Sequence, residues 1–254
     1  MYCKVLVAKP FDHAFVYKIG DGCDVKVGSV VNVPFGKQKD QIGIIYELYG
    51  TKFKEDNSYT VKEINFVYKD IFLNNNIIKS IEWIADYTLS PKGLVIKLFL
   101  VNKNIISNHT KDQEKYLFKP EPVNLNSEQK KAFNVINKSL FNKPSTIVLE
   151  GVTGSGKTEV YFEAIEKVLM QSKQVLIMLP EISLTPQFEK RFNSRFGFPP
   201  LVWHSKISDK KRKNIWHRCY EGDTSIVVGA RSSLFLPFNN LGLIVVDEEH
   251  DSSY

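Results

Sequence analysis

A glycine-rich stretch in the second half of the chain constrains its fold more than any other feature. Residues 151–158, GVTGSGKT, fit the pattern G-x-x-x-x-G-K-[ST] of a phosphate-binding loop (P-loop). A short β-branched run over 145–149 precedes the loop, and apolar residues at helical spacing follow it over 157–170. Strand, loop and helix N-terminus together make an anion site, because backbone N–H groups and the helix dipole converge there. The pattern therefore predicts a nucleotide site in an α/β fold.

Each residue type in the loop has a role in holding phosphate. Glycine lets the backbone close on phosphate oxygens, because a Cβ would stand in the way. Lys157 is expected to reach the β and γ phosphates, and Thr158 to ligate Mg²⁺. The other loop residues expected to contact the nucleotide are Gly151, Thr153, Gly154, Ser155 and Gly156.

Strand and helix patterns alternate after the middle of the chain. Helices are predicted over 127–140, 157–170, 183–195 and 208–220, and strands over 145–149, 174–178, 201–203, 225–228 and 243–246. Such alternation predicts a parallel sheet with helices on both faces. Asn126 or Ser127 can cap the first of these helices.

The first part of the chain is β-rich in pattern. Strands are predicted over 2–8, 14–19, 29–33 and 42–49, with turns over 20–22 and 34–37. These short strands predict a small barrel or sandwich. Residues 74–87 have helical spacing, and 94–101 are either a strand or a buried helix. We expect a β-rich domain over 1–104, a linker over 105–124 and an α/β domain over 125–254.

Composition excludes several classes of protein. Hydrophobic residues make up 43% and charged residues 24% of the chain, as in an ordinary globular protein. No apolar run is long enough to span a membrane, and the first residues lack a signal-peptide pattern. Cys3, Cys23 and Cys219 are scattered, which predicts reduced thiols in a cytoplasmic protein. The net charge of +6 permits a polyanionic partner without requiring one.

A second chemical feature follows the last predicted strand. The apolar run over 243–246 ends in the acids Asp247 and Glu248. In an open α/β sheet, ligands bind at the carboxyl ends of the strands, so Asp247 is expected at the P-loop edge. There Asp247 would hold the nucleotide Mg²⁺ through water, Glu248 would polarise the attacking water, and His250 would couple hydrolysis to movement. A charged turn that caps a core strand is the alternative interpretation.

Residues 247–250, DEEH, form a DExH box, and with the P-loop they resemble superfamily 2 nucleic-acid translocases. Longer motifs are similar to those of the bacterial primosomal replication-restart helicases: GVTGSGKTEVY over 151–161, LPEISLTPQ over 179–187, VGARSSLF over 228–235 and DEEHDSSY over 247–254. The likeness extends to VPFGKQ over 33–38 and ADY over 85–87. It implies an ATP- and Mg²⁺-dependent 3′-to-5′ DNA helicase with a β-rich 3′-end-binding domain before a RecA-like lobe. Another superfamily 2 translocase is an alternative that these longer motifs disfavour.

The resemblance also implies roles for individual residues. Gln129 would contact adenine. The residues expected at the DNA backbone are Thr185 and Gln187 of motif Ia, and Arg231 and Ser232 of motif Ib. Gly36 and Lys62 would line the pocket for a terminal nucleotide, although Lys62 is equally interpretable as a solvated strand residue. Val16 departs from the family, which often has a carboxylate there to accept the 3′-hydroxyl; Asp12 or Asp21 could substitute.

The extent of the chain departs from the family in two respects. The linker is too short for the family's winged helix, and the sequence stops directly after the DExH box. We therefore expect the N-terminal part of a helicase, with the second lobe, its arginine finger and its zinc ligands outside these residues. Expected partners are forked or single-stranded DNA, primosome proteins and single-stranded-DNA-binding protein. We expect a monomer that binds DNA and nucleotide without unwinding; the alternative is a stand-alone fork-binding module with a vestigial ATPase lobe.

Overall fold

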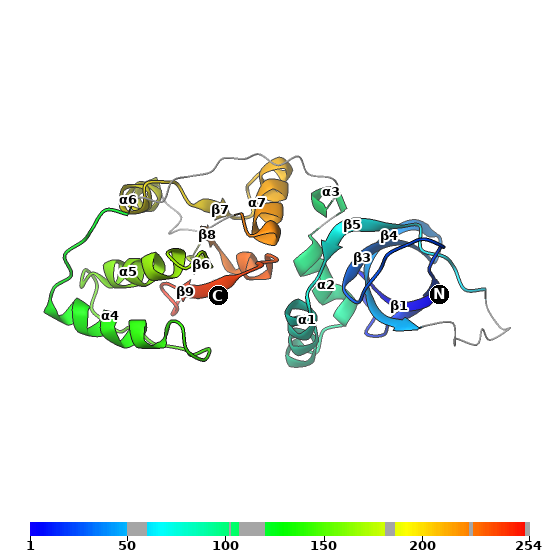
Figure 1. Cartoon of the computed structure of the whole chain (residues 1–254), viewed down its shortest axis with the longest axis horizontal. Coiled ribbons are helices and arrows are strands. Elements are labelled where there is room, and N and C mark those ends of the chain that lie inside the picture. The colour runs from blue at the N-terminus through cyan, green and yellow to red at the C-terminus, as the bar shows by residue number, and fades with distance from the viewer. Residues whose placement is uncertain (50–59, 102, 107–119, 181–185, 224–225, 252–254) are drawn as a thin grey trace. The chain divides into compact units, whose positions relative to one another are not determined.

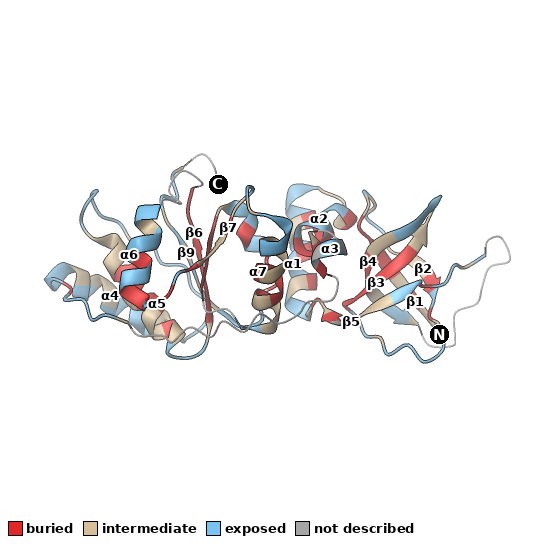
Figure 2. Ribbon diagram, turned by 90° about the horizontal axis from the view of Figure 1, so that it is seen from above, coloured by how far each residue is buried: buried red, intermediate tan, exposed pale blue. Residues whose placement is uncertain are grey.

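The computed structural model describes residues 1–49, 60–101, 103–106, 120–180, 186–223 and 226–251 (Figure 1). The chain divides into two compact units, Met1–His109 and Thr110–Tyr254. Each unit has its own buried core, shown in red in Figure 2.

Unit 1 is built on an antiparallel sheet with the strand order β2-β1-β4-β3-β5. Its strands are β1 (Tyr2–Val7), β2 (Phe15–Lys18), β3 (Ser29–Phe35), β4 (Gln38–Tyr49) and β5 (Phe66–Phe72). The sheet curls round on itself in Figure 1, and a bridge between Lys18 and Glu63 links the end of β2 to the chain just before β5. The β-rich domain is therefore confirmed, and of the two architectures predicted it is the barrel-like one.

Two local predictions in unit 1 need correction. Pro34 and Phe35, expected in a turn, belong to β3, so that only Gly36 and Lys37 make the turn. β5 was not predicted at all. Its residues pair with Ser29, Val31 and Asn32 of β3. The strand therefore forms because a partner distant in sequence provides hydrogen bonds, although its own sequence does not predict a strand.

Helices α1 (Asn75–Thr88), α2 (Lys92–Leu100) and α3 (Lys103–Ile106) complete unit 1. Asn74 caps α1, since its Oδ1 accepts a hydrogen bond of 3.0 Å from the Ile77 N–H. The apolar run over 94–101 lies in α2 and its C-cap, so it forms a buried helix rather than a strand. Gly93 allows this packing, because a Cβ there would lie 2.0 Å from the carbonyl oxygen of Lys9.

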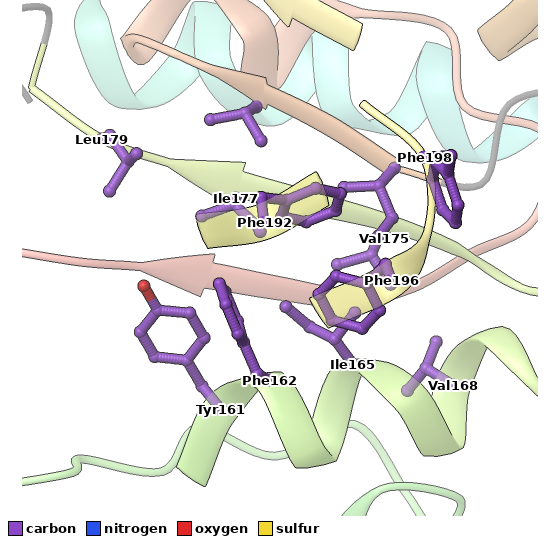
Figure 3. Close-up of a cluster of buried hydrophobic side chains, with 12 residues drawn as sticks. Tyr161, Phe162, Ile165, Val168, Val175, Ile177, Leu179, Phe192, Phe196 and Phe198 are labelled. Carbon is purple, nitrogen blue, oxygen red and sulfur yellow. The ribbon is translucent and has the colours of Figure 1, made fainter. Parts of the chain in front are cut away.

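Unit 2 holds a parallel sheet with the order β7-β8-β6-β9. The strands are β6 (Gln174–Met178), β7 (Leu201–Trp203), β8 (Ile226–Gly229) and β9 (Leu241–Val246). The helices are α4 (Ser127–Ser139), α5 (Lys157–Leu169), α6 (Pro186–Phe196), α7 (Asp209–Glu221) and the 3₁₀ helix η2 (Arg231–Phe235). Side chains from α5, α6 and the sheet interdigitate in one apolar cluster (Figure 3). The predicted parallel α/β fold is confirmed.

The predicted strand over 145–149 is wrong. These residues have no regular secondary structure and lie outside either sheet, and Val148 is 74% exposed. A β-branched run becomes a strand only where a neighbour supplies hydrogen bonds. Among the described residues, β9 is bonded to β6 on one side and is not bonded to 145–149 on the other.

A buried ionic cluster joins α5, α6 and the chain before α4. Arg195 is 5% exposed, and its Nη2 donates to Glu163 Oε2 at 3.0 Å and to Glu166 Oε2 at 2.6 Å. Its Nη1 donates to the carbonyl oxygen of Glu121, and the Glu121 N–H donates back to the Arg195 carbonyl at 2.9 Å. One turn earlier, Arg191 makes a more exposed pair with Glu159 at 2.5 Å.

These two arginines give a matched comparison of stability. Arg195→Ala should lower the free energy of unfolding by about 3 kcal/mol, because two carboxylates lose their buried counter-charge. Arg191→Ala should lower it by less than about 1 kcal/mol, because an exposed ion pair is weak. Urea denaturation followed by circular dichroism measures both. Equal effects would contradict the structural importance of the buried cluster.

Candidate nucleotide and DNA sites

The P-loop connects the irregular segment that ends at Glu150 to the first turn of α5. Gly154 and Gly156 have φ angles of 80° and 83°, in the left-handed region that favours glycine. Gly156 is the N-cap of α5 and has no side chain to cap the helix. The first N–H groups of a helix have no partner within the helix, so at this end they are not taken up by a capping side chain. This is the anion-binding geometry that the motif predicts.

Lys157 closes over its own loop. Its Nζ donates to the carbonyl oxygens of Gly151 at 2.6 Å and Val152 at 3.5 Å. The ammonium group is therefore held against the loop by backbone carbonyl oxygens, which carry only partial negative charge. A phosphate oxygen is a stronger acceptor for the same donor, because its negative charge adds a Coulomb attraction to the ammonium group that a neutral carbonyl lacks.

Gln129 lies against the P-loop. Asn126 and Gln129 form a capping box at the start of α4, with two reciprocal hydrogen bonds of 2.9 Å. The Gln129 Nε2 also donates to the Ser155 carbonyl oxygen at 3.0 Å. Asn126, one of the two caps considered, is thus the N-cap. The predicted contact of Gln129 with adenine stays a prediction, and in the structure its amide supports the phosphate loop.

The DExH box turns sharply after β9. The Asp247 N–H continues the sheet by donating to the Met178 carbonyl oxygen at 3.0 Å. Asp247 Oδ1 accepts the Glu248 N–H at 3.0 Å, and Oδ2 accepts the Tyr161 hydroxyl of α5 at 2.9 Å. Glu248 has a φ angle of 53°, a costly conformation for a residue with a Cβ. His250 lies 3.4 Å from the Glu248 carboxylate, and both side chains are exposed.

Motifs Ia and Ib follow the carboxyl ends of β6 and β8. Gln187 is exposed on α6, whereas Thr185 lies outside the described residues. Arg231 and Ser232 begin η2, and both are exposed. Ser232 Oγ accepts a hydrogen bond of 3.2 Å from the Trp203 indole. Their predicted DNA contacts remain predictions.

Unit 1 contains a hollow of about 350 Å³, within the size range of small-molecule sites. Its lining residues are Ala14, Phe15, Val16, Tyr17, Pro34, Phe35, Gly36, Thr60, Val61 and Lys62. Gly36 and Lys62 are thus brought together, with Lys62 Nζ donating to the Gly36 carbonyl oxygen at 3.2 Å. Asp12 and Asp21, considered as substitutes for a carboxylate at Val16, are not in the lining; Asp12 instead accepts the Lys92 N–H at 3.3 Å.

Aromatic rings form one wall of this hollow, and sequence analysis did not identify them. Phe15 packs edge-on against Phe35 with 4.9 Å between ring centroids, and Phe11 lies behind both. The Tyr17 hydroxyl donates to the Pro34 carbonyl oxygen at 3.0 Å. Burial, and secondarily Cys3, raises the pKa of Tyr17 to about 12, so that its phenol is neutral at physiological pH. The closely spaced Phe11, His13 and Phe15 were the available signal in the sequence.

Within the described parts of the chain, no cluster of three or more His, Cys, Asp or Glu side chains could hold a metal ion. Likewise, none of the described helices is both long and apolar enough to cross a membrane. Cys3 and Cys219 are buried free thiols, and Cys23 is an exposed one.

Comparison with known proteins identifies the class. Residues 126–254 match the model of the DEAD/DEAH box helicases, and residues 4–101 match that of the 3′DNA-binding domain (3′BD). The chain therefore belongs to the DEAD/DEAH box helicase family.

Particular relatives carry the name Replication restart protein PriA. The protein from Rickettsia felis is 41% identical over 94% of the chain, and that from Bacillus subtilis is 47% identical over 56% of it. The Chlamydia trachomatis protein is 30% identical over the whole chain. The resemblance to replication-restart helicases is thus confirmed. The matched regions are 36%, 18% and 44% of these relatives' lengths.

Two glycines of the P-loop provide a test of the Gln129 contact. A Cβ on Gly156 would lie 2.3 Å from Gln129 Nε2, whereas a Cβ on Gly154 would meet nothing within 4 Å. Both substitutions by alanine carry the left-handed backbone cost of about 1–2 kcal/mol. Gly156→Ala should cost about 1 kcal/mol more in denaturant titrations, from the added crowding. That difference should vanish in a Gln129→Ala background; if it persists, the crowding has another source.

Proposed function

We propose that these residues are the 3′-end-binding domain and first nucleotide-binding lobe of an ATP-dependent DNA helicase. This helicase would move 3′ to 5′ and would act in replication restart and primosome assembly at stalled forks. One observation carries the proposal. A chain that matches a 3′DNA-binding domain also has a P-loop helix hydrogen-bonded, through Tyr161, to the acid of its DExH box. A nucleotide-driven motor requires both parts.

The nucleotide site has donors that suit ATP and Mg²⁺. Backbone N–H groups at the start of α5, together with Lys157, would bind the phosphates. The Thr158 hydroxyl and the Asp247 carboxylate are hard oxygen ligands of the kind that Mg²⁺ prefers, directly or through water. Bound Mg²⁺ would neutralise charge that develops on the phosphates. Glu248 would orient the attacking water, and His250 would transmit the state of the nucleotide.

The hollow in unit 1 suits a single terminal nucleotide. Aromatic and aliphatic walls can stack against a base, and Lys62 can pair with a phosphate. Among the described residues, its lining includes no carboxylate, and Val16 stands where the family often has an acid. We therefore propose that the pocket selects an end by its shape and positive charge, rather than by accepting a hydrogen bond from the 3′-hydroxyl.

Other features of the function are proposed from the resemblance. Arg231, Ser232, Gln187 and Thr185 would contact the backbone of the tracking strand. Primosome proteins and single-stranded-DNA-binding protein would be partners of a monomer. The free thiols fit a reducing compartment, so we place the protein in the cytoplasm.

A polypeptide of these 254 residues should bind ATP and forked DNA without turning ATP over. Turnover in such motors requires an arginine finger from across the nucleotide cleft, and the resemblance assigns that finger to a second lobe. Titration with a fluorescent ATP analogue should show binding that Lys157→Ala abolishes. Fork-stimulated phosphate release would contradict the expected inactivity, and binding unchanged in Lys157→Ala would contradict the nucleotide site. Fork binding with no nucleotide binding would favour a stand-alone module with a vestigial lobe.

The proposed end pocket can be tested with matched lysines and matched DNAs. Lys62→Ala should weaken binding of a linear single strand about tenfold, the loss expected of one hydrogen bond to a charged group. Lys79→Ala, which removes the same charge from the exposed side of α1, should have little effect. Circular single-stranded DNA should compete poorly in fluorescence anisotropy, whereas a 3′-phosphorylated strand should bind as well as a 3′-hydroxyl strand. Equal losses for both lysines, or equal competition by the circle, would contradict end binding.

A further inference from the structure

A phenol on α5 reaches from the apolar core to the DExH box. The ring of Tyr161 belongs to the buried cluster around Phe162, and the residue is 7% exposed. Figure 3 shows its oxygen at the margin of the cluster, away from the packed rings. There the hydroxyl donates to Asp247 Oδ2 at 2.9 Å.

The position of Tyr161 on α5 links the two proposed Mg²⁺ ligands. Thr158 lies three positions earlier in the same helix, so the two side chains share a face. Tyr161 therefore holds Asp247 beside the helix face from which the Thr158 hydroxyl projects. Burial, followed by the charge of Asp247, raises the pKa of Tyr161, whereas the Thr158 side chain acts on the same phenol in the opposite direction.

Both carboxylate oxygens of Asp247 are oriented by this arrangement. Oδ1 accepts the Glu248 N–H at 3.0 Å, and Oδ2 accepts the phenol. Each carboxylate oxygen has two lone-pair sites, so an oxygen that accepts one of these hydrogen bonds can also accept one from a water molecule bound to a metal ion. An acid held at two points also loses less rotamer freedom when it binds a metal, which is how outer hydrogen bonds raise metal affinity.

The hydroxyl is not explained by packing. The ring fills the core next to Phe162, with 5.3 Å between centroids, and a phenylalanine would fill the same space. A hydroxyl in this setting is costly unless it is hydrogen-bonded, and Asp247 is its acceptor. We propose that Tyr161 is a positioning residue, whose hydroxyl orients Asp247 so that nucleotide binding at the P-loop is strengthened by Mg²⁺. This inference rests on the proposed nucleotide site.

The test compares nucleotide affinity with Mg²⁺ and with EDTA, using a fluorescent ADP analogue and the full 254-residue chain. The measured quantity is the ratio of the two affinities. Tyr161→Phe should reduce this ratio about tenfold, the scale of outer-sphere losses at metal sites, and should leave the metal-free affinity within about twofold. An unchanged ratio would overturn the proposal. A parallel fall in both affinities would also overturn it, because it would indicate a purely structural role.

Two further variants make the test specific. Tyr46 donates to the Glu82 carboxylate in unit 1, so Tyr46→Phe removes a similar phenol–carboxylate bond and should leave the ratio unchanged. Asp247→Asn should abolish the Mg²⁺ dependence, and adding Tyr161→Phe to it should have no further effect on the ratio. Additive losses would show that Tyr161 does not act through Asp247. Failure of the unaltered chain to bind nucleotide would refute the proposed function itself, which is a separate outcome.

Discussion

Parallel hydrogen bonding between β6 and its two neighbours, β8 and β9, is the constraint on which the nucleotide and DNA motifs of unit 2 depend. Parallel strands all end at the same edge of their sheet. β6, β8 and β9 lead into motif Ia, motif Ib and the DExH box, so their carboxyl ends lie at one edge although they fall at Met178, Gly229 and Val246 in the chain. The inner strands β6 and β8 are apolar and buried along their whole length, as strands covered on both faces must be, whereas β9 at the edge of the described sheet is partly exposed.

The P-loop is supported before any nucleotide binds. Gln129 bonds to its backbone, Lys157 folds over it, and the helix that it begins is tied to α6 by the buried Arg195 cluster. A loop held in its binding conformation loses less entropy when a ligand arrives. The same helix carries Tyr161, so a shift of α5 would move the support of Asp247 as well. The phosphate site and the acid that follows β9 are therefore mechanically connected through one helix.

Unit 1 brings together residues that are distant in sequence. β3 pairs with both β4 and β5. This pairing brings the turn at Gly36 close to residues 60–62, which precede β5 in the chain. The rings of Phe15 in β2 and Phe35 in β3 add an aromatic wall. Among the described lining residues Lys62 is the one basic side chain, and burial keeps the phenol of Tyr17 neutral. A pocket of that composition suits an anion and a flat apolar base.

Local patterns in the sequence determined the P-loop, the helix starts at Asn74 and Asn126, and the parallel α/β class, because caps, glycines and periodicity act over a few residues. They could not determine which strand-like runs find partners. The run over 145–149 stays outside the sheets, whereas the weaker pattern of β5 pairs with β3. The tertiary structure alone decided that Gln129 supports the phosphate loop, that Arg195 is buried between two acids, and that Tyr161 meets Asp247. Each of these contacts joins residues far apart in the chain, so its formation depends on packing that no short stretch of sequence encodes.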